Sequence, residues 1–119
     1  MRPDRDMAYL WDMLDSAKTV KEFTSGVTMN QYMQDRKLQL AVERSIEIIG
    51  EAARRISDEF KTTHPAIPWK GIVGQRNVIA HEYGEIKQER MWSIATSRIP
   101  ELIALLEPLL PPKAEEPNS

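Results

Sequence analysis

The sequence predicts an all-α protein, most simply an up-and-down bundle of four or five helices. Apolar residues recur at spacings of three and four along most of the 119 residues, which is the period of an amphipathic helix. No stretch alternates apolar and polar residues as a strand would, and the breaks between helical segments are short. We expect residues 1–110 to form one helical domain, and the proline-rich, acidic residues 111–119 to form a disordered tail.

Charge and composition restrict the function. A net charge of −2 gives no overall field that would draw the chain onto nucleic acid, so a contact with RNA would have to be local. The absence of cysteine excludes disulfides, thiolate metal sites and thiol catalysis. The N-terminus is too polar for a signal peptide, and no apolar run approaches the roughly 18 residues of a membrane span, so we expect a cytoplasmic protein without membrane contact.

The first helix is expected from Arg2 to Ser25. Gly26 is placed to end it in a left-handed turn, and Thr28 with Gln31 fits a capping box that starts the next helix. The inner face of the first helix is predicted to carry Met7, Leu10, Trp11, Leu14, Ala17 and Val20.

The longest periodic segment runs from Asn30 to Phe60 and predicts one long helix, with room for a bend near Asp35. Its seam comprises Leu38, Val42, Ser45, Ile49, Ala52, Ile56 and Phe60. An acidic stripe, formed by Glu43, Glu47 and Glu51 at four-residue spacing, follows one side. Two interpretations stay open: the stripe is a solvated face, or Glu51, beside Gly50 and Ala52, lies near a partner helix.

Prolines at 65 and 68 predict a break over Thr62 to Pro68, followed by a helix from Trp69 to about Glu82 with Gly84 as its C-cap. Gly71 and Gly74 lie near one face of this helix, which suggests the close approach of another helix or backbone. The last helical region is expected from Lys87 to Leu110, with a kink or two abutting helices around Ile99 because Pro100 interrupts it.

Four polar residues within the segment from Ile67 to Ile86 carry the candidate chemistry. Arg76 offers a planar fork for phosphate oxygens, and His81 can move a proton near neutral pH. Asn77 and Tyr83 add hydrogen-bonding groups. At 100° per residue, Tyr83 returns to the face of Arg76, whereas Asn77 and His81 lie about 100° to 140° around the helix. Arg76 and His81 therefore converge only if His81 lies at a fraying helix end or if a second copy completes the site across a two-fold axis.

The motif Arg76-Asn77-Val-Ile-Ala-His81-Glu-Tyr83 resembles that of the HEPN superfamily. Ala41-Val-Glu-Arg, Ile48-Ile-Gly-Glu-Ala, His64-Pro, Ile67-Pro-Trp and Ile99-Pro-Glu-Leu extend the resemblance to HepT-like ribonuclease toxins, which are encoded beside a minimal nucleotidyltransferase. The resemblance covers residues 2 to about 110. It implies an all-helical homodimer with the motif lining a cleft between the subunits.

The resemblance also implies the toxin of a type VII toxin–antitoxin pair, a metal-independent endoribonuclease in which the ribose 2′-hydroxyl attacks the adjacent phosphate. His81 would move the proton, Arg76 would bind the phosphate, and Asn77 would orient either of them, with Glu51 as a possible supporting residue. Tyr83 would be the tyrosine that the cognate nucleotidyltransferase antitoxin modifies with AMP. The implied partners are a second copy, the antitoxin and RNA; no metal and no cofactor are expected.

Two alternatives remain at this stage. The chain could be a non-catalytic, nucleotide- or substrate-binding helical subunit that serves a minimal nucleotidyltransferase. It could also be a dimeric helical module in which Arg76 and His81 only stabilise the interface. The second histidine, His64, is expected to be a loop residue rather than a metal ligand.

Overall fold

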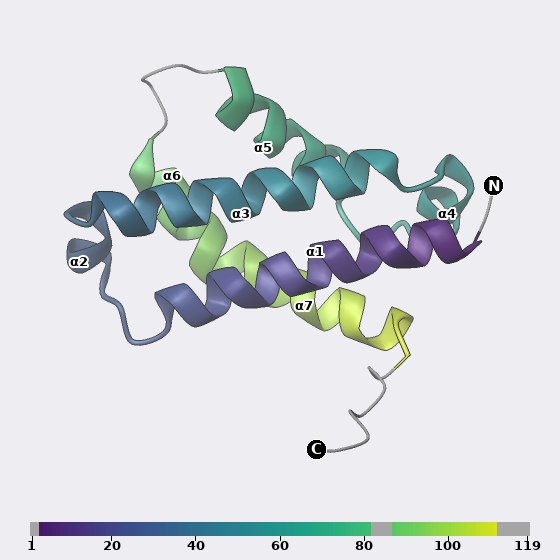
Figure 1. Ribbon diagram of the computed structural model, residues 1–119, viewed down its shortest axis with the longest axis horizontal. Coiled ribbons are helices and arrows are strands. Elements are labelled where there is room, and N and C mark those ends of the chain that lie inside the picture. The colour runs from purple at the N-terminus through teal and green to yellow at the C-terminus, as the bar shows by residue number, and fades with distance from the viewer. Residues whose placement is uncertain (1–2, 82–86, 112–119) are drawn as a thin grey trace.

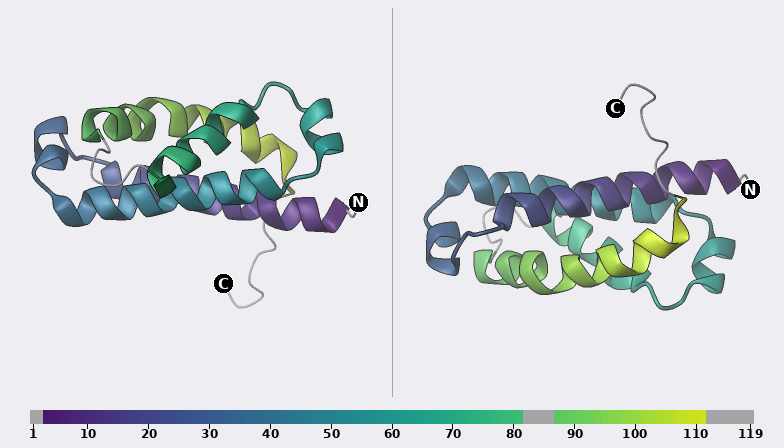
Figure 2. Two further views of the ribbon diagram at one scale, coloured as in Figure 1. Left: turned by 90° about the horizontal axis from the view of Figure 1, so that it is seen from above. Right: turned by 90° about the horizontal axis from the view of Figure 1, so that it is seen from below.

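A computed structural model describes residues 3–81 and 87–111, and this part of the chain is helical without a strand. The all-α bundle is therefore confirmed. Figure 1 shows α1 (Pro3–Thr24) and α3 (Arg36–Arg55) side by side, with α5 (Trp69–His81) lying along α3. A further layer, called the α6–α7 layer, consists of α6 (Gln88–Ser93), a π-helical turn (Ile94–Arg98) and α7 (Ile99–Leu106). Its α7 packs on α1 (Figures 1 and 2). The predicted tail, from residue 112 on, and Gly84 lie outside the described residues.

The start of the chain folds as the sequence predicts. Gly26 has a φ of 76°, the left-handed conformation expected after α1. Thr28 and Gln31 form the capping box of α2 (Met29–Met33). The described helices include none that is both long and apolar enough to cross a membrane.

The prediction of one helix from Asn30 to Phe60 is wrong, because the segment contains α2, α3 and α4 (Asp58–Thr63). Asp35 caps α3 by accepting a hydrogen bond from the backbone N–H of Leu38. Ser57 caps α4, and the Asp6 carboxylate of α1 accepts bonds from the backbone N–H and the hydroxyl of Ser57, at 2.9 and 2.6 Å. These caps provide local partners for the helix ends and so favour the breaks.

The predicted interruption near Ile99 is confirmed, and it has the form of a π-helical turn. The N–H of Ile99 bonds the carbonyl of Ile94, five residues earlier, and α7 begins at Ile99. Pro100 has no N–H to donate, and its ring would press on the carbonyl four residues earlier in a regular helix. The widened turn before it relieves this conflict and keeps the two helices in one continuous layer.

The core lies between α1, α3 and the α6–α7 layer. Most residues predicted to face inward are buried, whereas Met7, Trp11, Leu38 and Phe60 lie at its margin. The fully enclosed side chains also include Tyr32 of α2, which the periodicity did not indicate. The largest of these side chains are Tyr32, Leu10, Met13, Met91, Leu106, Val20 and Val42.

The close approach of two helices occurs at Gly50 of α3, not at Gly71 or Gly74. A Cβ added at Gly50 would collide with the Cβ of Arg76 and lie 3.1 Å from the carbonyl oxygen of Ile72. Added at Gly71 or Gly74, it would meet no atom of the described chain within 4 Å. The absence of a side chain at Gly50 therefore sets how closely α5 lies on α3.

We predict that Gly50→Ala lowers the free energy of unfolding by about 1–3 kcal/mol, because the two helices must move apart to accept the methyl group. Urea denaturation followed by circular dichroism measures the change. Gly71→Ala is the matched control, since the same substitution in an open helical position should leave stability unchanged or raise it by up to about 1 kcal/mol. Equal effects at the two glycines would contradict this role of Gly50.

Candidate functional site

Arg76 lies on the face of α5 that rests on α3, and three quarters of its side chain is buried. Its Nη2 is 3.1 Å from Oε1 of Glu51, and its Nη1 donates to Oδ1 of Asn77 at 3.1 Å. The Nε atom is buried without a partner within the described structure. These contacts hold the plane of the guanidinium in one orientation while leaving N–H groups of Nη1 and Nη2 for a further acceptor.

Glu51 is the anchor of this arrangement. Its other oxygen, Oε2, accepts from Arg54 and Arg55 of α3 at 3.1–3.2 Å. The hydrogen bond from Arg54, followed by the one from Arg55, lowers the pKa of the Glu51 carboxyl below its usual value. The carboxylate is thus ionised at neutral pH and keeps its charge for Arg76.

The acidic stripe is therefore not a solvated face. Glu51 reaches α5, as the second interpretation predicted, and Glu43 is 7% exposed and bonds to α6. Glu47 pairs with Arg44 on the same helix at 3.3 Å. Periodicity alone could not distinguish these environments.

The candidate residues share one helix but not one face. Arg76 is turned toward α3, whereas Asn77 is exposed and contacts Arg76 through its amide oxygen. His81 is the last residue of α5 that the structure describes. The side chain of His81 and the whole of Tyr83 lie outside what the structure describes. No contact between Arg76 and His81 is therefore assigned.

A shallow cavity of about 280 Å³ opens beside Arg76, between α1, α3 and α5. Arg44 and Arg55 also line it, and Tyr9 bonds to Arg55. That hydrogen bond, and then the contacts with Glu51, raise the pKa of Arg55. Asp12, Glu47 and Glu51 balance the three arginines, so the cavity combines phosphate-binding groups with no net positive charge.

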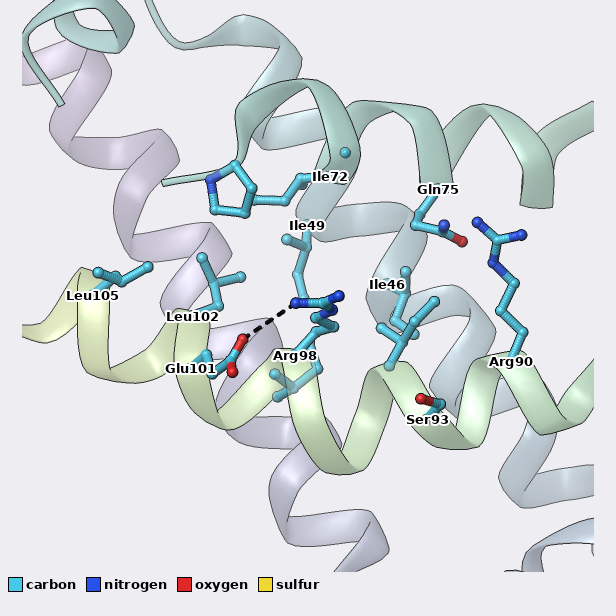
Figure 3. A pocket seen from close by; sticks show the side chains of 14 residues that line it. Ile46, Ile49, Ile72, Gln75, Arg90, Ser93, Arg98, Glu101, Leu102 and Leu105 are labelled. Carbon is cyan, nitrogen blue, oxygen red and sulfur yellow. Dashed lines mark ion pairs between the residues drawn. The ribbon is translucent and has the colours of Figure 1, made fainter. Parts of the chain in front are cut away.

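A larger cavity, of about 510 Å³, lies between α5, α3 and the α6–α7 layer (Figure 3). Its walls are mostly apolar, including Ile49, Ile72 and Leu102. Figure 3 shows the Gln75 amide and the Arg90 guanidinium pointing toward each other at one end. Oε1 of Gln75 is buried without a hydrogen-bond partner, so this end of the cavity has unused capacity to accept a hydrogen bond.

His64 has a structural environment. It caps the end of α4, its ring stacks on Phe60 with centroids 3.9 Å apart, and Nδ1 lies 3.0 Å from the carbonyl oxygen of Phe60. Trp69 closes this corner by donating from Nε1 to the His64 carbonyl at 3.0 Å. The described residues contain no group of three acidic or histidine side chains placed to hold a metal ion.

Comparison with known proteins places the chain in a family. The ribonuclease HepT-like family model matches residues 13–109. A candidate RNase of Methanocaldococcus jannaschii is 34% identical over 119 residues, which cover 98% of both chains. A second candidate RNase of that organism is 39% identical, over 80% of this chain and 87% of its own.

A third relative is the probable ribonuclease HepT of Thermococcus cleftensis, which is 35% identical over 85% of this chain and 92% of its own. No solved structure gives a significant match. The family match spans most of the chain, including α5 with the Arg76–His81 motif and the glutamates of α3 that contact α5 and α6. The chain belongs to the ribonuclease HepT-like family.

Proposed function

We propose that this chain is the toxin of a type VII toxin–antitoxin pair and an endoribonuclease that needs no metal. The observation that carries the proposal is the Arg76 guanidinium, held by Glu51 and Asn77, five residues before a histidine on the same helix. Family membership supports RNA as the substrate. A guanidinium can bind two phosphate oxygens, and imidazole can transfer protons near neutral pH.

The reaction follows from these two groups. The ribose 2′-oxygen forms a bond to the adjacent phosphorus as the bond from phosphorus to the 5′-oxygen breaks. The 2′-hydroxyl loses its proton and the leaving 5′-oxygen gains one, which leaves a 2′,3′-cyclic phosphate and a 5′-hydroxyl. His81 moves the proton, and Arg76 stabilises the negative charge that develops on the phosphate. Since the nucleophile belongs to the RNA, no metal-bound water is required.

The active form in this proposal is a homodimer. Arg76 faces α3, while helical geometry puts His81 about 140° around α5 from Arg76. A second copy across a two-fold axis would bring a His81 toward the Arg76 of its partner. The open space at Gly74 and the exposure of Asn77 support this arrangement.

We predict that His81→Ala abolishes RNA cleavage and the growth arrest caused by expressing the protein alone, while the dimer persists. Cleavage of labelled RNA, growth curves and sedimentation measure the three properties. His64→Gln is the matched control. The ring of His64 stacks on Phe60, outside the Arg76–His81 motif, so this variant should keep its activity. Toxicity of His81→Ala equal to that of the wild type would refute the mechanism.

The proposed control of the toxin is AMPylation of Tyr83 by the cognate nucleotidyltransferase. An adenylate there adds bulk and negative charge two residues from His81, where it would repel a substrate phosphate. We predict that co-expression with the neighbouring nucleotidyltransferase adds mass in AMP units and relieves growth arrest. Intact mass spectrometry measures the addition, and Tyr83→Phe should not acquire it. Added mass that persists in Tyr83→Phe would show that another residue is modified.

The second candidate function is a non-catalytic nucleotide- or substrate-binding subunit of a minimal nucleotidyltransferase. The cavity of about 510 Å³ favours it, because apolar walls with a free acceptor on Gln75 suit a small ligand with an apolar ring. The same experiments separate the two functions. Wild-type protein that leaves RNA intact, arrests no growth and binds AMP in this cavity would support the binding subunit.

A further inference from the structure

A partly buried polar network joins α2, α3 and the start of α6. The hydroxyl of Tyr32 donates to Oε1 of Gln88 at 2.8 Å, and Nε2 of Gln88 donates to Oε2 of Glu43 at 2.6 Å. Tyr32 has no exposed surface and Glu43 is 7% exposed. Burial, and then the nearby Glu43 carboxylate, raise the pKa of Tyr32 well above its usual value, so the phenol keeps the proton that it donates.

The network has one orientation. An ionised carboxylate only accepts hydrogen bonds, so the amide nitrogen of Gln88 must face Glu43 and its oxygen must face Tyr32. Arg36 supports the other side, with Nη1 3.4 Å from Glu43 and 3.2 Å from the amide oxygen of Gln39. Gln39 in turn donates to the carbonyls of Tyr32 and Met33 at 3.0 and 3.1 Å. These bonds hold Tyr32 and Glu43, the two side-chain partners of Gln88.

Gln88 has a particular place in the chain. It is the first residue of α6, after Lys87, whose side chain makes no cap hydrogen bond. Residues 82–87 separate it from His81 of α5. The side chain of Gln88 therefore anchors the start of α6, the helix that follows the motif, to α2 and α3.

The acidic stripe of α3 thus contacts both sides of the motif-bearing segment. Glu51 holds Arg76 in α5, and Glu43 holds Gln88 in α6 (α3, α5 and α6 in Figure 1). The two glutamates are eight residues apart, about 12 Å along a helix with a rise of about 1.5 Å per residue. A single rigid helix therefore sets the spacing between the phosphate-binding arginine and the chain beyond His81.

We propose that Tyr32, Gln88 and Glu43 form a positioning clamp for the ribonuclease site, with Gln88 as its central positioning residue. The clamp does not touch substrate. It fixes where the chain re-enters the bundle after His81, and so restricts where His81 can lie relative to Arg76. The inference rests on the proposed function for its effect on catalysis. For its effect on His81 it rests on the bonds of Gln88 and on the short connection, residues 82–87, that joins Gln88 to His81 in the sequence.

The test is Gln88→Met, which keeps the length of the side chain and removes both hydrogen bonds. On folded protein we expect kcat for RNA cleavage to fall by about 10–100-fold, because a misplacement of about 1 Å can cost that much. The charge-swapped pair Glu43→Gln with Gln88→Glu restores an acceptor for Tyr32 and a donor–acceptor pair between positions 43 and 88, and should recover most of the loss. An unchanged kcat in an active protein would overturn the proposal.

The matched control is Ser57→Ala, which removes a buried hydrogen bond to Asp6 between α1 and α4. It should lower the melting temperature, as Gln88→Met does, but keep kcat within about twofold, since it leaves both anchors on the acidic stripe intact. A similar loss of kcat in both variants would mean that stability, not positioning, controls the rate. Should Gln88→Met fail to fold, Tyr32→Phe removes a single hydroxyl and serves in its place.

A readout independent of RNA comes from the two histidines. Their ring resonances can be assigned by NMR with His81→Ala, and only that of His81 should shift or broaden in Gln88→Met. Ser57→Ala should leave His81 unchanged. If the wild type does not cleave RNA, the proposed function fails while this measurement still tests the clamp. An unchanged His81 resonance in Gln88→Met would overturn the clamp in either case.

Discussion

Helix α5 can lie close to α3 because position 50 carries no side chain. The stem of Arg76 occupies the space that a Cβ at Gly50 would take, and this brings the guanidinium within 3.1 Å of Glu51. An arginine has many rotamers, and holding it in one of them costs conformational entropy that the ion pair must offset. Close packing of the stem removes part of that freedom before any substrate binds. Gly50 and Glu51 of α3 therefore together fix the position of Arg76 in α5.

Helix α3 also explains how a small bundle can support a site on α5, one of its outer helices. α5 makes its principal contact with α3 and stands at the side of the bundle (Figure 2). Glu51 contacts Arg76 within the motif through an ion pair, and Glu43 contacts Gln88 beyond the motif through a partly buried hydrogen bond. A helix held mainly along one face leaves its opposite face open. In the proposed function, that open face meets a second subunit.

Local patterns predicted those parts of the structure whose causes are local. The period of apolar residues indicated α1, α5 and α7, and spacing with family resemblance singled out Arg76 and His81. Gly26 and the Thr28–Gln31 box marked the end of α1 and the start of α2. The break at Ser57 was missed although its cap is local, because Ser57 Oγ accepts from the backbone N–H of Phe60 and the bond from Ser57 to Asp6, 51 residues away, only adds to it. The burial of Glu43 was missed because it depends on a distant partner, since Gln88 is 45 residues away. A glutamate at helical spacing looks the same whether water or another helix faces it.

In the proposed function, α3 positions Arg76 to bind the phosphate of the RNA substrate. Single-turnover RNA cleavage by the wild type, Glu51→Gln, Arg76→Ala and the double variant tests it, with Glu47→Gln as the control from the same acidic stripe. If Glu51 acts through Arg76, Glu51→Gln slows cleavage in the wild type, Glu47→Gln does not, and the double variant is no slower than Arg76→Ala. Losses in the double variant equal to the product of the two single losses would contradict the account.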